Sequence, residues 1–495
     1  MSSLRTIGIA RSSLCSRAAS LKAAKISRMP HLSPVILPSG KSMSSQRLGG
    51  AHLGSTSRSI FTSSRIHTAT AVKREPAPTP ATSEETVELP ETNADDTRVA
   101  VGWPDGIWSR YHHFWLRDHC RCPECFHPVT KQRMVDTFAL PPDLHPKSVV
   151  STPHGLEVTC KLPWPTSPPH VSLYSWQWLR RNSYDPQTEP ISIAGTHPPP
   201  EPEEKILWGA GIVRDPPSVA YEEVMHDEFA VYKWLEKIDR FGFCFISGVP
   251  ATTEDTEKLV QRIAFIRHTQ YGGFWDFTAD LAHGDTAYTN IALPAHTDNS
   301  YFTDPCGLQM FHLLMHEQGT GGQTLLVDGF YAASILKELH PDSYELLSNV
   351  LIPTHSAGDE DTLYRARPLS GNPILRHDPL NKNTLIQVRY ANDHRSAMRN
   401  VEPGMMMDWY NALRHWNSCL TSSDSEYWVQ LSPGTVVVVD NHRVLHGRSA
   451  FTGKRRMCGA YVGLDDWRAR LDALRGKYLG GNRDTTGRSV WDPAF

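Results

Sequence analysis

The pattern of apolar and polar residues first predicts a set of helices. Apolar side chains recur every three or four positions in residues 221–243 and 255–266, which predicts two amphipathic helices. Residues 332–349 and 403–419 have the same periodicity, and we expect a shorter helix at residues 173–181. These stretches account for most of the helical structure that the pattern predicts.

Short apolar runs between Gly, Pro, Asn and Asp turns predict strands. Residues 99–103 and 107–116 flank a Pro-Asp-Gly turn and predict a β-hairpin. Further strands are expected at residues 243–249, 307–314, 323–327, 384–390, 435–439 and 459–462. Many short strands with helices beside them indicate a mainly β fold with flanking helices, in which the strands form a double-sheet jelly roll.

Composition divides the N-terminal region. Residues 1–74 are rich in Ser, Arg and Lys and contain no Asp or Glu, which is typical of a mitochondrial transit peptide. A disordered basic tail is the alternative interpretation of the same composition. Residues 75–96 are acidic and rich in Pro and Thr, so we expect a linker there.

Two folded parts are expected after the linker. Residues 97–190 form a small N-terminal domain, and a Pro- and Glu-rich loop at residues 198–204 separates it from a large domain at residues 206–474. The tail at residues 475–495 has no assigned function. The chain of 495 residues, 39% hydrophobic, is long enough to bury a sizeable core in these parts.

Charge and hydropathy limit the classes of partner. A net charge of −3 gives no argument for binding nucleic acid or a membrane surface. No apolar run approaches the ~20 residues that a membrane-spanning helix needs. Nine cysteines in a chain of this length do not suggest a disulfide framework, which agrees with a reducing compartment such as the mitochondrial matrix.

A candidate metal site is formed by His296, Asp298 and His446. On an extended segment His296 and Asp298 point to the same side, so both can bind one ion. His446 follows the apolar run at residues 436–439, which reads as a buried strand that delivers a histidine just past its end. Two histidines and one carboxylate on one face are the ligand set of non-heme Fe(II) oxygenases, although the same ligands also suit a hydrolytic zinc enzyme.

A second candidate metal site is the cysteine cluster Cys120-Arg121-Cys122-Pro123-Glu124-Cys125. Three thiols within six residues can converge on one Zn²⁺, which takes four ligands in a tetrahedral arrangement. The fourth ligand must come from elsewhere, and His119 and His127 are the local candidates. A fully protein-ligated ion would be structural because no coordination position stays open.

Three segments resemble one enzyme family. HTDNSYFTDPCG, GTGGQTLLVDGFYAA and DNHRVLHGRSAFTGKRRMCGAY are similar to the γ-butyrobetaine hydroxylase and trimethyllysine dioxygenase family of Fe(II)/2-oxoglutarate oxygenases. The likeness runs from about residue 87 to residue 474. It implies a double-stranded β-helix domain with the iron between its sheets, preceded by a small zinc-binding β-rich domain in which His170 completes the cysteine set.

The resemblance also implies the cosubstrate site. Arg455 holds the family's position for binding the far carboxylate of 2-oxoglutarate, a role that suits a planar guanidinium. Arg448 and Arg456 are the neighbours that compete for this assignment. Thr324 matches the position that donates a hydroxyl hydrogen bond to the same cosubstrate, although a strand threonine without a ligand is the plainer interpretation. Ascorbate is expected as an added reductant, and O₂ is the oxidant.

Aromatic residues carry the substrate prediction. The family binds a quaternary ammonium in an aromatic box, because ring faces attract a cation that cannot donate a hydrogen bond. The matching positions are Tyr271, Trp275, Tyr288 and Tyr461. Core packing is the alternative role for each of them taken singly.

Asp285 distinguishes the two carnitine enzymes. The hydroxylase of γ-butyrobetaine has asparagine at this position, whereas the acidic residue is similar to trimethyllysine dioxygenases and could pair with the α-ammonium of trimethyllysine. The resemblance therefore implies hydroxylation of N6,N6,N6-trimethyllysine at C3, the first step of carnitine biosynthesis. The alternative is γ-butyrobetaine hydroxylation, the last step.

Two more distant functions fit these residues less well. An oxygenase that acts on an alkyl sulfonate would not need the aromatic positions, and a zinc-bearing interaction protein would not need Arg455 together with the three iron ligands. The family further implies a homodimer, and the trimethylammonium amino acid is the expected small-molecule partner.

Overall fold

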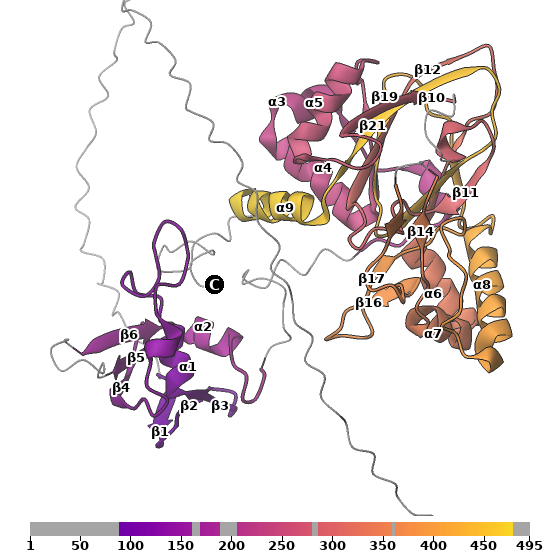
Figure 1. Cartoon of the computed structure of the whole chain (residues 1–495). Coiled ribbons are helices and arrows are strands. Elements are labelled where there is room, and N and C mark those ends of the chain that lie inside the picture. The colour runs from indigo at the N-terminus through magenta and orange to yellow at the C-terminus, as the bar shows by residue number, and fades with distance from the viewer. Residues whose placement is uncertain (1–88, 161–168, 189–204, 280–285, 359–361, 479–495) are drawn as a thin grey trace, which may run out of the picture. The chain divides into compact units, whose positions relative to one another are not determined.

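The computed structural model describes residues 89–160, 169–188, 205–279, 286–358 and 362–478 (Figure 1). The predicted transit peptide, most of the predicted linker, the loop at residues 198–204 and most of the tail lie outside the described residues. No helix among the described residues is long and apolar enough to cross a membrane.

Two antiparallel three-stranded sheets and two short helices form the N-terminal part. The first sheet contains β1 (Glu91–Ala94), β2 (Arg98–Gly102) and β3 (Trp108–His112), and the second contains β4 (Pro146–Thr152), β5 (Gly155–Cys160) and β6 (His170–Tyr174). The helices are α1 (His113–Asp118) and α2 (Trp176–Arg181), with a 3₁₀ turn η1 (Thr137–Ala139). Val101, Leu116, Leu156 and Leu179 are fully buried in their shared core.

Three predicted boundaries in this part are wrong. Strand β1 lies inside the stretch predicted as a linker, because Glu91–Ala94 gains backbone partners on β2 despite its polar side chains. The second arm of the predicted hairpin ends at His112, and α1 begins at His113. The helix predicted at residues 173–181 starts only at Trp176, because Ser175 caps it and the residues before Ser175 pair with β5.

Two main sheets form the core of the larger part. The first has seven strands in the order β10-β21-β12-β19-β8-β7, with β9 also paired to β21, and the second has four in the order β11-β20-β13-β18. The strands of the first sheet are β7 (Ser218–Ala220), β8 (Phe243–Ser247), β9 (Ile266–Arg267), β10 (Phe274–Thr278), β12 (Leu308–Glu317), β19 (Thr435–Asp440) and β21 (Lys454–Val462). Those of the second are β11 (Leu293–His296), β13 (Thr324–Asp328), β18 (Tyr427–Val429) and β20 (Val444–Arg448).

The valine run on β19 shows how the layers are built. Val437 and Val439 pack in the core between the two sheets, and Val436 and Val438 pack on the opposite face against helices. A strand that is buried on both faces is continuously apolar rather than alternating. The outcome is the predicted mainly β jelly roll with helices outside it.

Helices cover the outer faces of both sheets (Figure 1). The large sheet is covered by α3 (Tyr221–His226), α4 (Glu228–Phe241), α5 (Thr253–Ile263) and α9 (Leu464–Tyr478). The small sheet is covered by α6 (Gly329–Leu339), α7 (Pro341–Asn349) and α8 (Met406–Leu420). Three 3₁₀ turns connect these layers: η2 (Ala210–Arg214), η3 (Thr286–Tyr288) and η4 (Pro403–Met405). Two small two-stranded sheets accompany them, β14 (His355–Ser356) with β15 (Tyr364–Arg365) and β16 (Leu375–His377) with β17 (Leu385–Val388).

Two predictions about elements of this part need correction. The single helix predicted at residues 221–243 is broken at Asp227, whose side chain accepts a hydrogen bond from the amide of Phe229 and caps α4. His446 does not lie just past the strand at 436–439 but in the middle of the next strand, β20. The apolar pair Val444-Leu445 is too short to signal a separate strand in the sequence.

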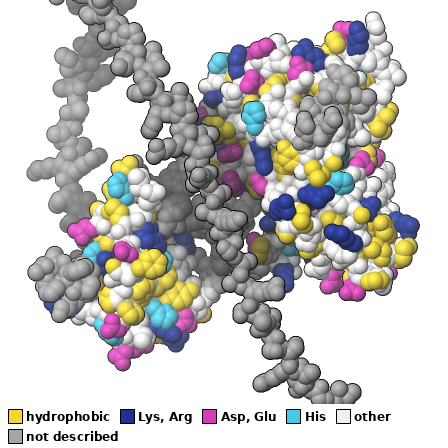
Figure 2. Space-filling view, in the orientation of Figure 1, with side chains coloured by type: hydrophobic (Ala, Val, Ile, Leu, Met, Phe, Trp, Pro, Cys, Tyr) yellow, Lys and Arg dark blue, Asp and Glu magenta, His cyan; other side chains and the backbone are white. Residues whose placement is uncertain are grey.

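Charged side chains of both signs are interspersed with hydrophobic ones on the visible face of the described residues (Figure 2). Mixed charges of this kind do not create an extended field of one sign over that face.

Candidate active site

A cavity of about 690 Å³ opens between the two sheets of the larger part. Its walls come from β10, β12 and β21 of the large sheet, from β11, β13 and β20 of the small sheet, and from α8. Cavities of this size hold small organic molecules. The cavity contains the three predicted metal ligands and most of the predicted binding residues.

The structure brings His296, Asp298 and His446 together. Strands β11 and β20 are antiparallel neighbours in which His296 lies directly opposite His446. His296 Nε2 is 3.2 Å from Asp298 Oδ1, and His446 Nε2 is 3.6 Å from the same oxygen. One ligand atom from each residue lies within 4.8 Å of the others, so the three side chains can hold one ion on a single face.

Hydrogen bonds orient two of these ligands. Nδ1 of His296 lies 2.8 Å from the carbonyl oxygen of Pro294, which leaves Nε2 facing Asp298. Asn441 spans the loop that carries Asp298: its Oδ1 accepts from the Asp298 amide at 2.7 Å, and its Nδ2 donates to the Asp298 carbonyl at 3.0 Å. The turn between β19 and β20 therefore holds the loop that presents the carboxylate.

Two further residues contact the Asp298 side chain. Tyr461 Oη donates to Asp298 Oδ2 at 2.7 Å, and Gln309 Nε2 donates to the same oxygen at 2.6 Å. Sequence reasoning missed Gln309 and Asn441. A glutamine inside the apolar run of β12 and an asparagine at the end of a buried strand are the only signals that the sequence offered for them.

The protonation states of Asp298 and His446 favour the binding of a metal cation. Burial alone would raise the pKa of Asp298, but its interactions with His296 and His446 hold that pKa well below its usual value. Burial, with the neighbouring His296, lowers the pKa of His446. A charged carboxylate and a neutral imidazole are the forms that bind a metal ion.

Arg455 and Thr324 both line the cavity. Arg455 on β21 is 6% exposed, and its Nε has no hydrogen-bond partner among the described residues. Burial, with the neighbouring Arg448, lowers the pKa of Arg455 to about 10, so its guanidinium stays charged at neutral pH. Thr324 on β13 is 7% exposed. A buried cation and a hydroxyl that line the same cavity are suited to binding an anionic group there.

The two competing arginines are engaged elsewhere. Arg448 also lines the cavity, but its guanidinium donates to three main-chain carbonyl oxygens, those of Ala287, Thr289 and Ile291. Arg456 forms an ion pair with Asp276 and is largely exposed. The Nε of Arg448 is also without a hydrogen-bond partner among the described residues, but its two terminal nitrogens donate to these carbonyls. Arg455 lines the same cavity, and its guanidinium makes no hydrogen bond to the described residues.

The four predicted aromatic residues line the same cavity. The rings of Trp275 and Tyr461 have centroids 6.2 Å apart, as do those of Tyr271 and Tyr288. Tyr461 extends its hydroxyl to the metal-binding carboxylate in addition to presenting its ring. Asp285 lies outside the described residues.

Tyr301 supports one of these rings. Its hydroxyl lies 3.1 Å from the hydroxyl of Tyr271, and it accepts a hydrogen bond from Gln270 Nε2 at 2.7 Å. Tyr301 is 1% exposed and belongs to the segment that follows Asp298. The loop that carries a metal ligand is thereby linked to an aromatic wall of the cavity.

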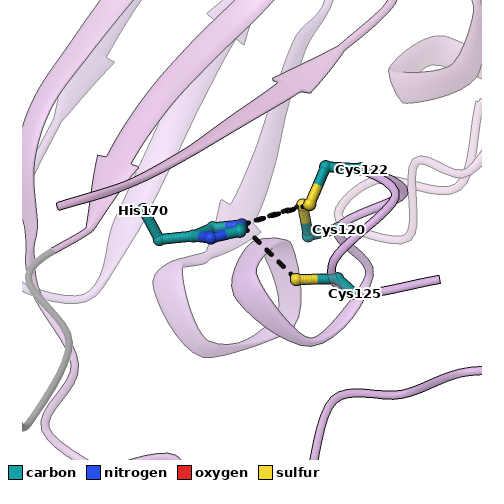
Figure 3. A group of neighbouring side chains, drawn as sticks. All are labelled: Cys120, Cys122, Cys125 and His170. Carbon is teal, nitrogen blue, oxygen red and sulfur yellow. Dashed lines mark hydrogen bonds between the residues drawn. The ribbon is translucent and has the colours of Figure 1, made fainter. Parts of the chain in front are cut away.

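In the N-terminal part the structure brings Cys120, Cys122, Cys125 and His170 together (Figure 3). His170 Nε2 lies 3.3, 3.6 and 3.4 Å from the three Sγ atoms in that order. A hydrogen bond from Cys125 and the contact with His170 lower the pKa of Cys120. Burial and the neighbouring Cys120 raise the pKa of Cys122, and the hydrogen bond to Cys120 and burial raise that of Cys125, so Cys120 is the thiol that carries the negative charge. Three thiols and an imidazole are a donor set for Zn²⁺.

The local competitors of His170 point elsewhere. Nδ1 of His119 lies 2.8 Å from the carbonyl oxygen of Trp115, and Nδ1 of His127 accepts from the amides of Val129 and Thr130. Neither belongs to the group of four side chains.

Two family descriptions match the chain. Residues 204–461 match the taurine catabolism dioxygenase TauD, TfdA family, and residues 91–180 match the N-terminal region described as γ-butyrobetaine hydroxylase-like. The two matches correspond to the two parts of the described structure.

The chain is similar to individual dioxygenases over most of their length. The chain is 41% identical over 402 residues to a trimethyllysine dioxygenase of Meyerozyma guilliermondii, which covers 78% of this chain and 96% of the relative. It is 40% identical over 359 residues to the mitochondrial trimethyllysine dioxygenase of Homo sapiens, which covers 72% and 81%. A γ-butyrobetaine dioxygenase of Homo sapiens is 27% identical over 388 residues and covers 78% and 96%.

Proposed function

The chain belongs to the TauD/TfdA family of 2-oxoglutarate-dependent dioxygenases and, within it, to the trimethyllysine dioxygenases, and from this we propose that it hydroxylates free N6,N6,N6-trimethyllysine at C3. The observation that carries the choice of substrate is the difference in identity, 41% to a trimethyllysine dioxygenase against 27% to a γ-butyrobetaine dioxygenase. The reaction would be the first step of carnitine biosynthesis.

Fe(II) fits the site that His296, Asp298 and His446 form. Two imidazoles and one carboxylate on one face are the donor set of non-heme Fe(II) oxygenases, and they leave coordination positions free for other ligands. The charged Asp298 and neutral His446 are ready to bind a divalent cation without losing a proton first.

The cosubstrate 2-oxoglutarate fits beside Arg455 and Thr324. The buried, uncommitted guanidinium of Arg455 would bind the far carboxylate, and the hydroxyl of Thr324 would donate to the same group. When bound, Fe(II), 2-oxoglutarate and O₂ together supply an oxidant that inserts one oxygen atom into an unactivated C–H bond and yields succinate and CO₂. The chain itself needs no general base for that reaction, and its task is to position the carbon and exclude water.

The aromatic residues supply the recognition of the trimethylammonium group. Tyr271, Trp275, Tyr288 and Tyr461 offer ring faces within one cavity, and a quaternary ammonium is attracted to such faces without needing a hydrogen-bond acceptor. The mostly buried surroundings of Trp275 and Tyr461 strengthen this attraction because little water competes for the cation.

Asp285 would bind the α-amino end of the substrate. A carboxylate at this position would pair with the α-ammonium of trimethyllysine and repel γ-butyrobetaine, whose corresponding end is purely anionic. Replacement of Asp285 by Asn is the test. A variant that keeps its full preference for trimethyllysine would remove Asp285 from the account.

Structural Zn²⁺ in the N-terminal domain is a further part of the proposal. It is supported by the convergence of Cys120, Cys122, Cys125 and His170, which would fill all four tetrahedral positions and leave none for a substrate. Ascorbate would act only as a reductant that keeps the iron in the Fe(II) state.

We also propose the mitochondrial matrix as the location and a homodimer as the assembly. The composition of residues 1–74 supports a transit peptide, and relatives from Homo sapiens and Gallus gallus are named mitochondrial. Because strand β1 begins at Glu91, we propose a linker that ends before this residue and a small domain that extends from there to residue 190. The large domain at residues 206–474 and the tail at residues 475–495 belong to the same proposal.

The test is succinate release by the purified chain with Fe(II), ascorbate and 2-oxoglutarate. Addition of trimethyllysine should stimulate turnover and give a hydroxylated product by mass, whereas γ-butyrobetaine should not. Stimulation by γ-butyrobetaine alone would transfer the enzyme to the last step of the pathway. Activity that persists without 2-oxoglutarate would favour hydrolytic chemistry at the same ligands.

A further inference from the structure

The two oxygens of the Asp298 carboxylate face different partners. Oδ1 faces the two histidines, with His296 Nε2 at 3.2 Å and His446 Nε2 at 3.6 Å. Oδ2 faces away from them and accepts hydrogen bonds from Gln309 Nε2 at 2.6 Å and from Tyr461 Oη at 2.7 Å. Oδ1 is therefore the carboxylate oxygen that would coordinate an ion held by both histidines.

The donors to Oδ2 stand on a rigid support. Gln309 on β12 and Tyr461 on β21 are directly opposite each other in the register of the large sheet, and Gln309 Nε2 lies 3.5 Å from Tyr461 Oη. Both residues are almost fully buried, 3% and 4% exposed. Asp298 itself lies in the turn after β11, outside the strand pairing, so its side chain depends on these two donors for its orientation.

We propose that Tyr461 and Gln309 are positioning residues that hold Asp298 as a ligand through Oδ1 alone and thereby set the affinity of the site for its metal. Two donors occupy the lone pairs of Oδ2, so this oxygen cannot turn toward the ion without the loss of two buried hydrogen bonds. The inference rests on the proposed iron site. It gives the Tyr461 hydroxyl a task that is separate from the task of its ring.

Coordination through one oxygen has a functional consequence. A carboxylate that bound through both oxygens would use one of the positions that the cosubstrate and O₂ need. Outer hydrogen bonds to a ligating carboxylate also fix its direction, and their loss typically costs ~10- to 100-fold in metal affinity. Gln309 and Tyr461 therefore protect both the affinity and the open positions of the site.

The hydroxyl and the ring of Tyr461 can be separated by substitution. Tyr461→Phe keeps the ring that packs against Trp275, with centroids 6.2 Å apart, and removes only the donor to Asp298. Gln309→Met keeps a similar volume and removes the second donor. Tyr271→Phe is the matched control, because it removes a hydroxyl from the same cavity that contacts Tyr301.

The experiment is a calorimetric titration of the full chain with Mn(II) in the absence of substrate. Mn(II) does not need protection from O₂, and its preference for oxygen and nitrogen ligands directs it away from the cysteine cluster, which is kept loaded with Zn²⁺. Tyr461→Phe and Gln309→Met should each raise the Kd for Mn(II) by about 10- to 100-fold. Tyr271→Phe should keep the Kd of the parent chain.

A second readout separates positioning from general damage. At saturating Fe(II), Tyr461→Phe should keep a KM for trimethyllysine near that of the parent, because its ring is intact, while kcat falls. An equal rise of this KM in Tyr461→Phe and in a ring-removing Tyr461→Leu variant would contradict the separation of ring from hydroxyl.

Three outcomes decide the proposal. A parent-like Kd for Mn(II) in both folded variants would overturn it, and so would a parent chain that does not bind Mn(II). The variants can lose Mn(II) affinity even if the parent chain does not turn over trimethyllysine. That combination would support the positioning role and refute only the proposed substrate. The metal titration thus fails or succeeds independently of the substrate assignment.

Discussion

At the scale of single residues, Arg455 is distinguished from its neighbours by what its guanidinium does not contact. The terminal nitrogens of Arg448 donate to main-chain carbonyls and Arg456 pairs with Asp276, whereas the guanidinium of Arg455 is buried at the cavity without a hydrogen bond to the described residues. Because a buried cation without an acidic partner is costly, an anionic ligand is the natural complement.

Arg455→Met should therefore weaken 2-oxoglutarate binding. Hydrogen bonds to a charged group contribute about 1.5–3 kcal/mol, so the KM for 2-oxoglutarate should rise roughly 10- to 100-fold. Steady-state kinetics with varied 2-oxoglutarate measure this. Arg456→Met is the control and should keep the KM of the parent. A larger rise of the KM in that variant than in Arg455→Met would show that Arg456, not Arg455, binds the carboxylate.

Tyr271→Leu should weaken the binding of the trimethylammonium group. Loss of one ring face costs about 0.5–2 kcal/mol, which corresponds to a rise of roughly 2- to 30-fold in the KM for trimethyllysine. The KM for 2-oxoglutarate should stay unchanged when it is measured in the same preparation. If both values rose together, Tyr271 would be a packing residue of the cavity and not part of a cation site.

The sequence revealed the residues with a distinctive chemistry and missed those that only orient them. His296 and Asp298 have a spacing that suits one metal ion, and the cysteine cluster is dense enough to be noticed. Gln309, Asn441 and Tyr301 act through partners that are distant in the chain. No spacing within the sequence could indicate those contacts.

At the scale of elements, the cysteine loop and strand β6 meet at His170. The strand starts at this residue, and its imidazole faces three thiols from an earlier segment. Cys120, the first of them, lies 50 residues before His170. An ion at this point would tie the first half of the small domain to its second sheet, so its removal should loosen both.

His170→Ala should lose the zinc that the parent chain carries and lower the melting temperature of the N-terminal domain. Structural zinc sites contribute folding free energy directly, so the loss should be evident as chelator-sensitive unfolding. Metal analysis and a thermal melt measure the two effects. His127→Ala is the matched control, because Nδ1 of His127 accepts hydrogen bonds from main-chain amides. Loss of zinc in His127→Ala but not in His170→Ala would make His127 the fourth zinc ligand.

Helix and strand types were predictable where periodicity extended over many residues, and boundaries were not. The apolar stripe of residues 221–243 is continuous, yet the capping side chain of Asp227 divides it into α3 and α4. Strand β20 escaped prediction because its pairing with β11 and β13, and not its composition, makes it a strand. Tertiary pairing decided these cases.

At the scale of the whole molecule, residues 1–74 should be dispensable for chemistry and required for location. Every proposed ligand and binding residue lies beyond position 119, so a chain that starts at residue 75 should keep its kcat/KM. The same deletion should abolish accumulation in mitochondria, because the basic, acid-free segment is the expected import signal. Cell fractionation and assay of the purified chain measure the two effects, and mitochondrial accumulation of the shortened chain would refute the transit peptide.

Turnover of trimethyllysine under isotopically labelled O₂, with the products analysed by mass spectrometry, distinguishes 2-oxoglutarate-dependent hydroxylation from other chemistry at the same ligands. Hydroxylation by an Fe(II)/2-oxoglutarate dioxygenase predicts one labelled atom in the hydroxyl group at C3 and one in succinate. A hydroxyl group that carries oxygen from water, or succinate formed without any hydroxylated trimethyllysine, would contradict the account.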